Sequence, residues 1–436
     1  MPHAQNDRIS PRLLLVGGAR PVSLSVDMLE LALAQAHARG LPTHVTGRAE
    51  ALAATERALA AADAVSVVDH TAPGATAAWA LTRVAAGERF DAVFALQEMA
   101  QVAVAETAEA IGAPGNPPGA IRRIRTKDAC RRALAAAGFA QPRVRLCSTA
   151  ADAEAFVRDT AGPWVVKPRD AMGSIGVSLL SGPDGLPAAL ELLPDARPFL
   201  VEEYVDGDEY SVEGVLLDGV ARVLAITEKE KATPPHFVEV GHVLPAELPH
   251  AARDEINRQV TAALSTLGLR TGAFHVELWL TAEGVVLGEV HGRYGGDWIH
   301  RMLAYAVPGL EVYGLLYDDM LARTAHTACT THTARTARGG GAAAGSGAPL
   351  EATRGAAVRY FTPPPGRLVA VEGWEEVRAQ PDVLHAELTV APGEVIHPLR
   401  RSGDRAGFVL VGAPDATQAR LRARQLVESV RFLTTP

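Results

Sequence analysis

The hydrophobic and polar positions over the first part of the chain alternate between short apolar runs and longer amphipathic stretches. Residues 13–16, Leu-Leu-Leu-Val, precede Gly17 and Gly18 and predict a buried parallel strand that ends in a tight turn. A helical pattern follows over residues 25–39. Further strands are expected at 64–68 and 91–96, and further helices at 49–61 and 99–111. This alternation predicts a small α/β unit built on a parallel sheet.

The pattern changes after a cluster of chain breakers at residues 112–118, Gly-Ala-Pro-Gly-Asn-Pro-Pro, which forces a loop. Helical periodicity resumes over residues 120–138 and stops at a glycine. Between residues 144 and 320 short strands rich in β-branched residues dominate, and a helix is expected at 253–267. The strands expected there are 164–166, 199–201, 211–217, 274–280 and 285–290. We therefore place a domain boundary near residue 120.

The region after residue 320 begins with a segment of unusual composition. Residues 322–353 are dominated by Ala, Thr, Gly and Ser and show no apolar period, so we expect a flexible linker with its centre at 339–347. The alternating pattern then returns. It predicts strands at 357–361, 367–371, 386–390 and 407–411, and a helix at 415–430. These elements predict a compact α+β domain.

Composition and charge narrow the classes of function. The chain has 436 residues, 48% hydrophobic and 21% charged, which is typical of a soluble globular protein with two to four domains. The formal net charge is -8 and the basic residues are scattered, so nucleic acid is not expected as a partner. Cys130, Cys147 and Cys329 form no CxxC pair, which argues against a disulfide framework or a structural zinc site and fits a reducing cytoplasm. The polar N-terminus and the absence of an apolar stretch near the roughly 20 residues of a membrane span argue against secretion and a membrane location.

A strand that delivers a lysine to a glycine-bearing loop is the most informative segment. Lys167 follows the expected strand 164–166, and Gly173, Ser174 and Gly176 stand in the loop after it. The backbone N–H groups of such a loop can cover phosphate oxygens while the lysine supplies a point charge. The alternative is that the glycines only make a hairpin turn, but the lysine at the end of the strand favours the phosphate interpretation.

An acidic segment between two apolar strands is the second candidate. Residues 199–212 read as a strand, a polar hinge around Tyr204 and another strand. The backbone of a hinge can bind an adenine edge, and a carboxylate a few residues later, here Glu209, can accept both ribose hydroxyls. The alternative of a solvated acidic hairpin leaves the clustering beside an aromatic residue unexplained.

Two glutamates on successive strands are the third candidate. Glu277 shares a strand face with His275, and Glu289 shares a face of the next strand with His291. If the strands form a hairpin the carboxylates converge, and they would repel each other unless a cation such as Mg²⁺ lay between them. In the alternative, each glutamate forms an ion pair with an arginine, Arg293 being the obvious partner.

These segments occur in order over residues 11 to about 310, and together they resemble the ATP-grasp superfamily. The residues that carry the resemblance are Lys127, Val166-Lys167-Pro168 with its loop, the hinge from Glu202 to Glu209, and Glu277, Glu289 and Arg293. Within the superfamily the chain is similar to the branch of carbamoyl-phosphate synthetase and biotin carboxylase, in particular to the L-amino-acid ligases that make dipeptides such as bacilysin. Segments 237–242, 289–293 and 359–366 support the finer resemblance.

The resemblance implies an ATP-grasp fold of α/β and α+β class. Its parts would be an N-terminal Rossmann-like, pre-ATP-grasp domain over residues 1–120 and an ATP-grasp domain over 121–322. The second domain would combine a lid subdomain at about 145–205 with a central antiparallel sheet. A linker at 323–353 and a small α+β domain at 354–436 would follow.

The resemblance also implies roles for individual residues. ATP would be bound by Lys127, Lys167, Gly173, Ser174, Gly176, Glu202, Tyr204, Val205 and Glu209. Mg²⁺ would be held by Glu277, Glu289 and His291. The substrates would lie beside Glu239, His242, Arg293, Gly295 and Gly296, although a satisfied hydrogen bond in a loop explains His242 nearly as well. Arg293 and Lys167 would be the catalytic residues, Arg293 by stabilising the acyl phosphate and the tetrahedral intermediate.

His291 departs from the family pattern, because most ATP-grasp enzymes have an asparagine two residues after the second metal-binding glutamate. Neutral imidazole is a poor ligand for Mg²⁺ and a better one for Mn²⁺ or Zn²⁺. Either one metal has fewer protein ligands, or the metal preference has shifted towards Mn²⁺, or activity is lost.

The activity that the resemblance implies is ATP-dependent ligation of a carboxylate to an amine through an acyl phosphate, with release of ADP and phosphate. The expected partners are small-molecule acids and amines, in particular amino acids. A carrier-bound acceptor and a homodimer are left open, and neither nucleic acid nor a membrane is expected. The alternatives are a carboxylase that activates bicarbonate and an ATP-binding protein without catalysis.

Overall fold

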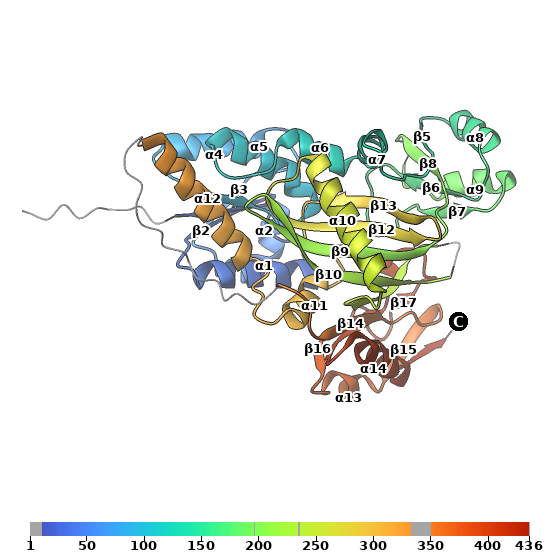
Figure 1. Ribbon diagram of the computed structural model, residues 1–436. Helices are drawn as coiled ribbons and strands as arrows, with labels where there is room; N and C mark the ends of the chain where they lie inside the picture. The colour runs from blue at the N-terminus through green and yellow to red at the C-terminus, as the bar shows by residue number, and fades with distance from the viewer. Residues whose placement is uncertain (1–10, 196, 234–235, 333–349, 436) are drawn as a thin grey trace, which may run out of the picture.

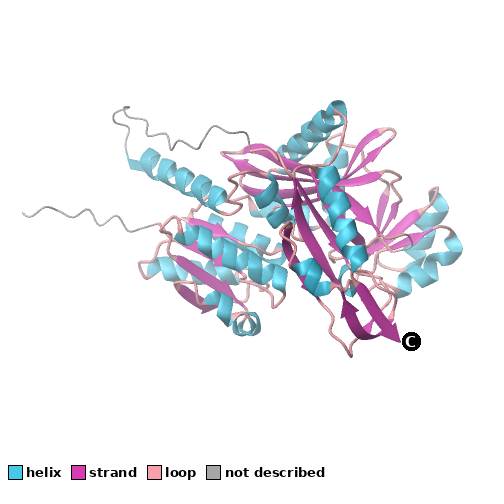
Figure 2. Ribbon diagram, turned by 90° about the horizontal axis from the view of Figure 1, so that it is seen from below, coloured by secondary structure: helices cyan, strands magenta, loops and turns pink. Residues whose placement is uncertain are grey.

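The computed structural model describes residues 11–195, 197–233, 236–332 and 350–435. Its N-terminal unit, blue in Figure 1, is a parallel sheet with the strand order β3-β2-β1-β4. The strands are β1 (Leu13–Val16), β2 (Thr43–Gly47), β3 (Ala64–Val67) and β4 (Ala92–Phe94). The helices α1 (Ser23–His37), α2 (Ala49–Ala54), α3 (Glu56–Leu59), α4 (Ala75–Ala85) and α5 (Gln101–Ile111), with the 3-10 helix η1 (Glu98–Ala100), cover the sheet (Figure 2). The predicted α/β unit is confirmed.

Strand β2 and helix α4 were not predicted. Strand β2 reads Thr-His-Val-Thr-Gly and is buried at every position, because it lies between β1 and β3. Its polar residues conceal the apolar run that marks most buried parallel strands. Helix α4 buries only Thr76 and Ala80 among its eleven residues.

An antiparallel sheet with the strand order β13-β12-β9-β10-β11-β14-β18-β16 forms the centre of the molecule. The strands from the middle of the chain are β9 (Asp208–Leu217), β10 (Val220–Lys231), β11 (Glu239–Leu244), β12 (Gly272–Thr281) and β13 (Gly284–His291). Helix α10 (His250–Leu267) lies across the sheet in Figure 1 and shares a hydrophobic core with it. Strands β10 and β11 were not predicted. In β10 the charged run Thr-Glu-Lys-Glu-Lys at residues 227–231 breaks the alternation of apolar and polar positions.

The last part of the chain continues the central sheet. Strand β14 (Gly355–Tyr360) pairs with β11, so that Gly241 lies opposite Arg359. Strands β18 (Gly407–Ala413) and β16 (Val383–Leu388) follow, and α14 (Ala416–Ser429) packs against them. Strands β15 (Gly366–Glu372), β17 (Val395–Ile396) and β19 (Arg431–Thr435) form a small sheet, accompanied by α13 (Trp374–Arg378) and η3 (Ser402–Asp404). The expected strands 357–361, 367–371 and 407–411 coincide with β14, β15 and β18, and 386–390 overlaps β16, whereas β17, β19 and α13 were not predicted. The sequence pattern did not indicate that three of these strands belong to the central sheet.

A second antiparallel sheet, at the upper right of Figure 1, has the order β5-β8-β6-β7 and lies where a lid subdomain was expected. Its strands are β5 (Val144–Cys147), β6 (Trp164–Pro168), β7 (Ser178–Leu180) and β8 (Phe199–Glu203). Helices α8 (Ala150–Asp159) and α9 (Leu186–Glu191) and the 3-10 helix η2 (Pro183–Gly185) accompany it.

The helical segments between these parts differ from the expectation at two places. The helix expected at 120–138 is divided into α6 (Pro118–Arg125) and α7 (Lys127–Ala136), because Thr126 adopts an extended conformation with φ -108° and ψ 102°. Helix α12 (Gly314–His332) extends into the linker expected at 323–353, so the first part of that segment is helical. The centre of the expected linker, 339–347, lies outside the described residues.

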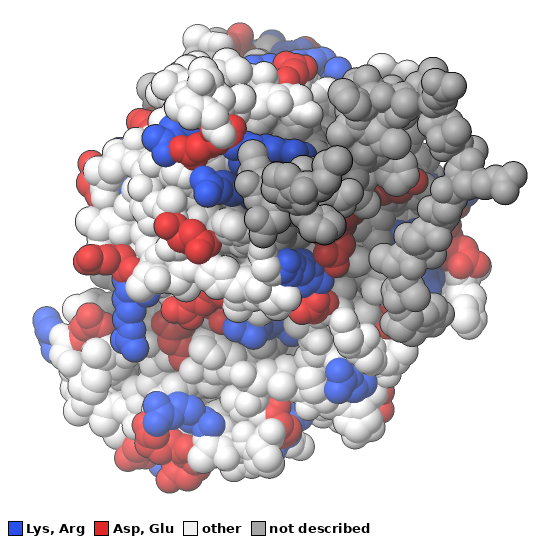
Figure 3. Space-filling view, turned by 90° about the vertical axis from the view of Figure 1, so that its left-hand side faces the viewer, with Lys and Arg blue, Asp and Glu red and all other residues white. Residues whose placement is uncertain are grey.

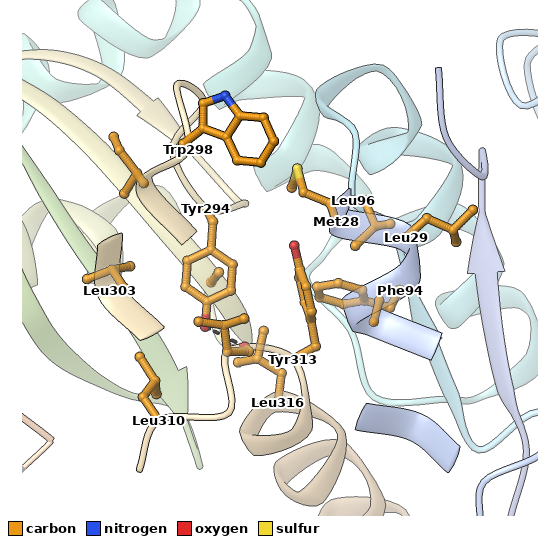
Figure 4. Close-up of a cluster of buried hydrophobic side chains, with 14 of the residues drawn as sticks. Met28, Leu29, Phe94, Leu96, Tyr294, Trp298, Leu303, Leu310, Tyr313 and Leu316 are labelled. Atoms are coloured by element: carbon orange, nitrogen blue, oxygen red, sulfur yellow. Dashed lines mark hydrogen bonds between the residues drawn. The ribbon is translucent and has the colours of Figure 1, made fainter. Parts of the chain in front are cut away.

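A shared hydrophobic core fixes the N-terminal unit against the central sheet (Figure 4). Met28 and Leu29 of α1 and Phe94 of β4 face Tyr294 and Tyr313 across it. The Tyr294 hydroxyl donates a hydrogen bond of 2.6 Å to the carbonyl of Val312 (dashed in Figure 4). Helix α11 (Ile299–Ala306) contributes further to this core. The N-terminal unit therefore has a fixed position relative to the edge of the central sheet that carries the candidate residues.

The surface on the N-terminal side carries charges of both signs. Basic and acidic side chains are interspersed over the described part of the face in Figure 3. Among the described helices, none combines the length and the apolar character that crossing a membrane requires.

Candidate active site

A cleft opens between the lid sheet and the central sheet and gathers most of the residues singled out from the sequence. The candidates that line it are Lys127, Lys167, Gly173, Ser174, Glu202, Tyr204, Val205, Glu209, Glu239, Glu277, Glu289, His291 and Arg293. They come from the start of α7, strands β6 and β8 with the glycine loop and the hinge that follow them, strands β9, β11, β12 and β13, and the segment after β13. Elements far apart in the sequence thus form one site.

Lys167 and Glu202 form a buried ion pair on neighbouring strands of the lid sheet. The Lys167 Nζ lies 2.5 Å from Oε1 of Glu202, and Nε of Arg131 on α7 lies 2.8 Å from Oε2. Burial lowers the pKa of Lys167. Burial alone would raise the pKa of Glu202, but the charges of Arg131 and Lys167 lower it overall. The carboxylate of Glu202 is therefore ionised and surrounded by cations.

The hinge after β8 offers its backbone and an aromatic pair. The N–H of Tyr204 donates to the carbonyl of Pro163, the residue before β6, at 3.0 Å, so this amide is engaged within the lid subdomain. The rings of Tyr204 and Phe237 stack with their centroids 6.1 Å apart, and both residues line the cleft. An adenine ring would find an aromatic surface and the backbone of Val205 here.

The glycine loop is held over the cleft by contacts on both sides. Gly173 and Ser174 have positive φ angles of 67° and 59°. The Ser174 hydroxyl donates to the carbonyl of Phe237 at 2.5 Å, and the N–H of Ser402 donates to the carbonyl of Gly173 at 3.1 Å. Ser402 belongs to the last part of the chain, which therefore helps to close the site.

Strands β12 and β13 form the hairpin that was expected, with His275 opposite His291. Glu289 lies 2.7 Å from the Nζ of Lys127, and Glu277 lies 3.3 Å from the Nζ of Lys229. Burial alone would raise the pKa of Glu289, but Lys127 lowers it to about 2. Both carboxylates line the cleft, and each forms an ion pair with a lysine. The alternative in which each glutamate pairs with an arginine is therefore wrong.

Arg293 instead pairs with a glutamate of the N-terminal unit. Oε2 of Glu98 accepts a hydrogen bond from Nε of Arg293 at 2.7 Å and lies 3.1 Å from Nδ1 of His291. Arg125 also contacts Glu98, which is only 8% exposed. The sequence analysis missed Glu98. The feature of the sequence that could have identified Glu98 is its position as an acidic residue between the apolar segments 92–96 and 99–111.

Lys229 and Lys231 on β10 were also missed. Their ammonium groups lie 2.5 and 2.6 Å from the two carboxylate oxygens of Glu209, the candidate for ribose binding. The neighbouring Glu228 and Glu230 point to the opposite face, where Arg420 of α14 contacts both. The alternation of Glu and Lys at 228–231 is the period-two signal of a strand whose two faces both carry charge.

Some candidates lie outside the cleft lining. His242 is buried, and its Nε2 lies 3.0 Å from Oδ2 of Asp297, as in the alternative of a satisfied hydrogen bond. Gly295 packs so closely that an added Cβ would lie 2.6 Å from the side chain of Ile299. Gly296 faces open space, and Gly176 packs against Leu192 and two prolines behind the loop.

The described residues contain no group of three or more His, Cys, Asp or Glu side chains arranged to hold a metal ion by themselves. Mg²⁺ is usually bound by one or two carboxylates together with substrate phosphates. The oxygen donors of Glu277 and Glu289, which face the same cleft as the glycine loop, fit such a shared arrangement. The imidazole of His291, with Nε2 3.6 Å from Oε2 of Glu289, lies beside them.

Comparison with known proteins agrees with this geometry. Residues 160–301 match the family model for the ATP-grasp domain. The chain contains an ATP-grasp domain. Residues 359–435 match the model for the L-amino acid ligase C-terminal domain 2. The resemblance inferred from the sequence is thereby confirmed.

Individual relatives are similar in sequence to part of this chain. An uncharacterised protein of Sinorhizobium fredii is 28% identical over 334 residues, which cover 74% of this chain and 64% of that protein. The alanine–anticapsin ligase of Bacillus subtilis is 26% identical over 279 residues, 57% of this chain and 58% of that protein. The chain thus spans about three-fifths of the length of these curated relatives.

Solved structures confirm the ATP-grasp fold. The crystal structure of an L-amino acid ligase from Bacillus licheniformis superposes with a TM-score of 0.77 at 21% identity. It covers 98% of this chain, and this chain covers 99% of it. At this level of identity the likeness shows the fold.

Proposed function

We propose that this ATP-grasp protein is a ligase that joins a carboxylate to an amine, with amino acids as substrates, through an acyl phosphate and with release of ADP and phosphate. The observation that carries the proposal is the convergence, in one cleft, of the ammonium groups of Lys127 and Lys167, the carboxylates of Glu277 and Glu289 and the guanidinium of Arg293. The names of the ligases among the relatives support the same reaction class.

The first step would be attack of a substrate carboxylate oxygen on the γ-phosphorus of ATP. The bond between that phosphorus and the oxygen bridging to the β-phosphate breaks, leaving ADP and an acyl phosphate. Lys127, Lys167 and the amides of the glycine loop would neutralise charge on the transferring group. Glu277 and Glu289 would hold Mg²⁺, which would supply further neutralisation of the phosphate charge.

The second step would be attack of the amine on the carbonyl carbon of the acyl phosphate. The carbon–oxygen bond to phosphate breaks, the nitrogen loses a proton, and an amide and inorganic phosphate result. Arg293, oriented by Glu98, would stabilise the oxyanion, and Glu239 would bind a substrate ammonium. The loop around Ser174 would exclude water, which otherwise hydrolyses the acyl phosphate.

The test is release of ADP and phosphate from Mg-ATP over a matrix of single amino acids, amino acid pairs and bicarbonate. The proposal expects turnover that requires a defined acid and amine and is lost in Lys167→Ala and Arg293→Met. Arg258→Ala is a matched control, because Arg258 forms an exposed ion pair with Glu255 on α10, outside the cleft. Turnover with bicarbonate alone would favour the carboxylase, and ATP binding without any turnover would favour a non-catalytic role.

A further inference from the structure

The lysines of this chain are concentrated at a single place. Lys and Arg together number 42, but only four are lysines. They are Lys127, Lys167, Lys229 and Lys231, and all four line the cleft. The other 38 residues of that total are arginines, so all the lysines of the chain lie in the cleft. An ammonium is a compact point charge that can approach several acceptors at once, whereas a guanidinium is a planar fork.

Lys229 makes contacts that require a compact ammonium group. Its side chain is only 3% exposed, and its Nζ lies 2.5 Å from Glu209, 3.3 Å from Glu277 and 3.4 Å from Glu239. These glutamates stand on three different strands, β9, β12 and β11. Without a cation between them, three carboxylates this close would repel one another and move apart.

We propose that Lys229 is the positioning residue that holds the ribose-binding, metal-binding and amine-binding carboxylates, Glu209, Glu277 and Glu239, in one arrangement. The proposal rests on the proposed function, because the roles of these carboxylates come from it. In this role Lys229 acts through the three glutamates, so its loss changes recognition at three places together.

Lys231 provides a matched control on the same face of the same strand. It lies 2.6 Å from Glu209, and its side chain is 23% exposed. Removal of Lys231 should affect ribose recognition alone, whereas removal of Lys229 should affect ribose and metal binding together. The difference between the two variants separates a positioning role from a general change of charge in the cleft.

The experiment compares the wild-type protein, Lys229→Met and Lys231→Met by calorimetric binding of Mg-ATP and of the 2′,3′-dideoxy analogue. The Mg²⁺ concentration that half-saturates nucleotide binding is measured in parallel. We expect the wild-type protein to prefer ATP over the dideoxy analogue by roughly tenfold, the scale of hydrogen bonds to a charged group. In Lys229→Met the ratio of the affinity for ATP to the affinity for the dideoxy analogue should fall towards one. The Mg²⁺ concentration that half-saturates nucleotide binding should rise. In Lys231→Met the preference should fall with the Mg²⁺ requirement unchanged.

The outcomes separate the two proposals. A folded Lys229→Met protein with wild-type preference and Mg²⁺ requirement would overturn the role of Lys229, as would an equal change of Mg²⁺ requirement in Lys231→Met. If Lys229→Met does not fold, Lys229→Gln replaces it, and failure of both to fold while Lys231→Met folds would assign Lys229 to structure alone. If the wild-type protein binds no Mg-ATP, the proposed function itself fails.

Discussion

Glu98 and Arg293 are 195 residues apart in the sequence, yet Oε2 of Glu98 accepts a hydrogen bond of 2.7 Å from Nε of Arg293. The same oxygen lies 3.1 Å from Nδ1 of His291. A carboxylate of the N-terminal unit therefore orients two side chains of the cleft, and the shared core around Tyr313 and Phe94 holds that unit in place. Through this contact the N-terminal unit supports the candidate active site.

Glu98→Gln should impair turnover more than nucleotide binding. The glutamine keeps the shape but removes the charge that faces Arg293, His291 and Arg125, so the guanidinium loses its fixed direction. We expect kcat to fall about 100-fold, the scale associated with misplacing a catalytic group by about 1 Å, with little change in the Kd of Mg-ATP. Glu106→Gln is the control, because Glu106 pairs with Arg122 away from the cleft lining. Equal loss of activity in both variants would contradict the orienting role.

His291→Asn should shift metal preference towards Mg²⁺. In the wild-type protein Nδ1 of His291 is held by Glu98, and Nε2 points to Glu289. A carboxylate on the far nitrogen is the usual support of a metal-binding histidine. We expect the ratio of Mn²⁺ to Mg²⁺ affinity, measured by electron paramagnetic resonance of Mn²⁺ with bound ATP and Mg²⁺ competition, to fall about tenfold in the variant. The exposed His250→Asn should leave the ratio unchanged, and an unchanged ratio in His291→Asn would show that His291 is not a ligand.

The parts of the site that the sequence predicted are those with short-range signals. The pattern of a strand followed by a glycine loop predicted Lys167, Gly173 and Ser174 as site residues. The period of two along a hairpin predicted Glu277 and Glu289. In each case the residues are neighbours in sequence, and strand geometry fixes how they face.

The parts that the sequence did not predict depend on long-range contacts or on charged strands. Lys229 was missed because β10 carries charge on both faces, one towards the cleft and one towards Arg420 of α14, so no apolar face marks the strand. Glu98 and Ser402 contact the cleft residues Arg293 and Gly173 from distant segments of the chain. The strand β14 was placed correctly, but its pairing with β11 is a property of tertiary structure that local periodicity does not specify.

Gly176→Ala should destabilise the protein more than Gly173→Ala. Both glycines have positive φ angles, 68° and 67°, which cost an alanine about 1 kcal/mol. A Cβ at residue 176 would also lie 3.0 Å from Pro194 and 3.1 Å from the carbonyl of Leu192, whereas one at residue 173 meets Ser402 only at 3.8 Å. We expect unfolding free energies lower by about 3 kcal/mol and about 1 kcal/mol respectively in urea titrations. Equal losses would show that the crowding behind Gly176 is relieved by movement of the loop.

His300 is a buried histidine at the junction of the N-terminal unit and the central sheet. Its side chain is 0% exposed, and Nε2 lies 2.7 Å from Oδ2 of Asp27 on α1. Burial lowers the pKa of His300 below its ordinary value of 6.5, although Asp27 acts in the opposite direction. The neutral imidazole therefore donates its Nε2 hydrogen to Asp27, while Arg301 pairs with the same carboxylate and His385 lies nearby across Trp298.

The stability of the protein should consequently fall as the pH is lowered below about 6.5. A histidine with a lowered pKa in the folded state binds its proton more readily in the unfolded chain, so its contribution is present above the unfolded pKa of 6.5 and is lost as the pH falls through the folded value. Urea unfolding between pH 5 and 7.5 should show this slope in the wild-type protein and a smaller slope in His300→Gln. His250→Gln, at an exposed position on α10, should keep the wild-type slope. The same slope in His300→Gln as in the wild-type protein would mean that other buried histidines, such as His44 and His385, carry the dependence instead.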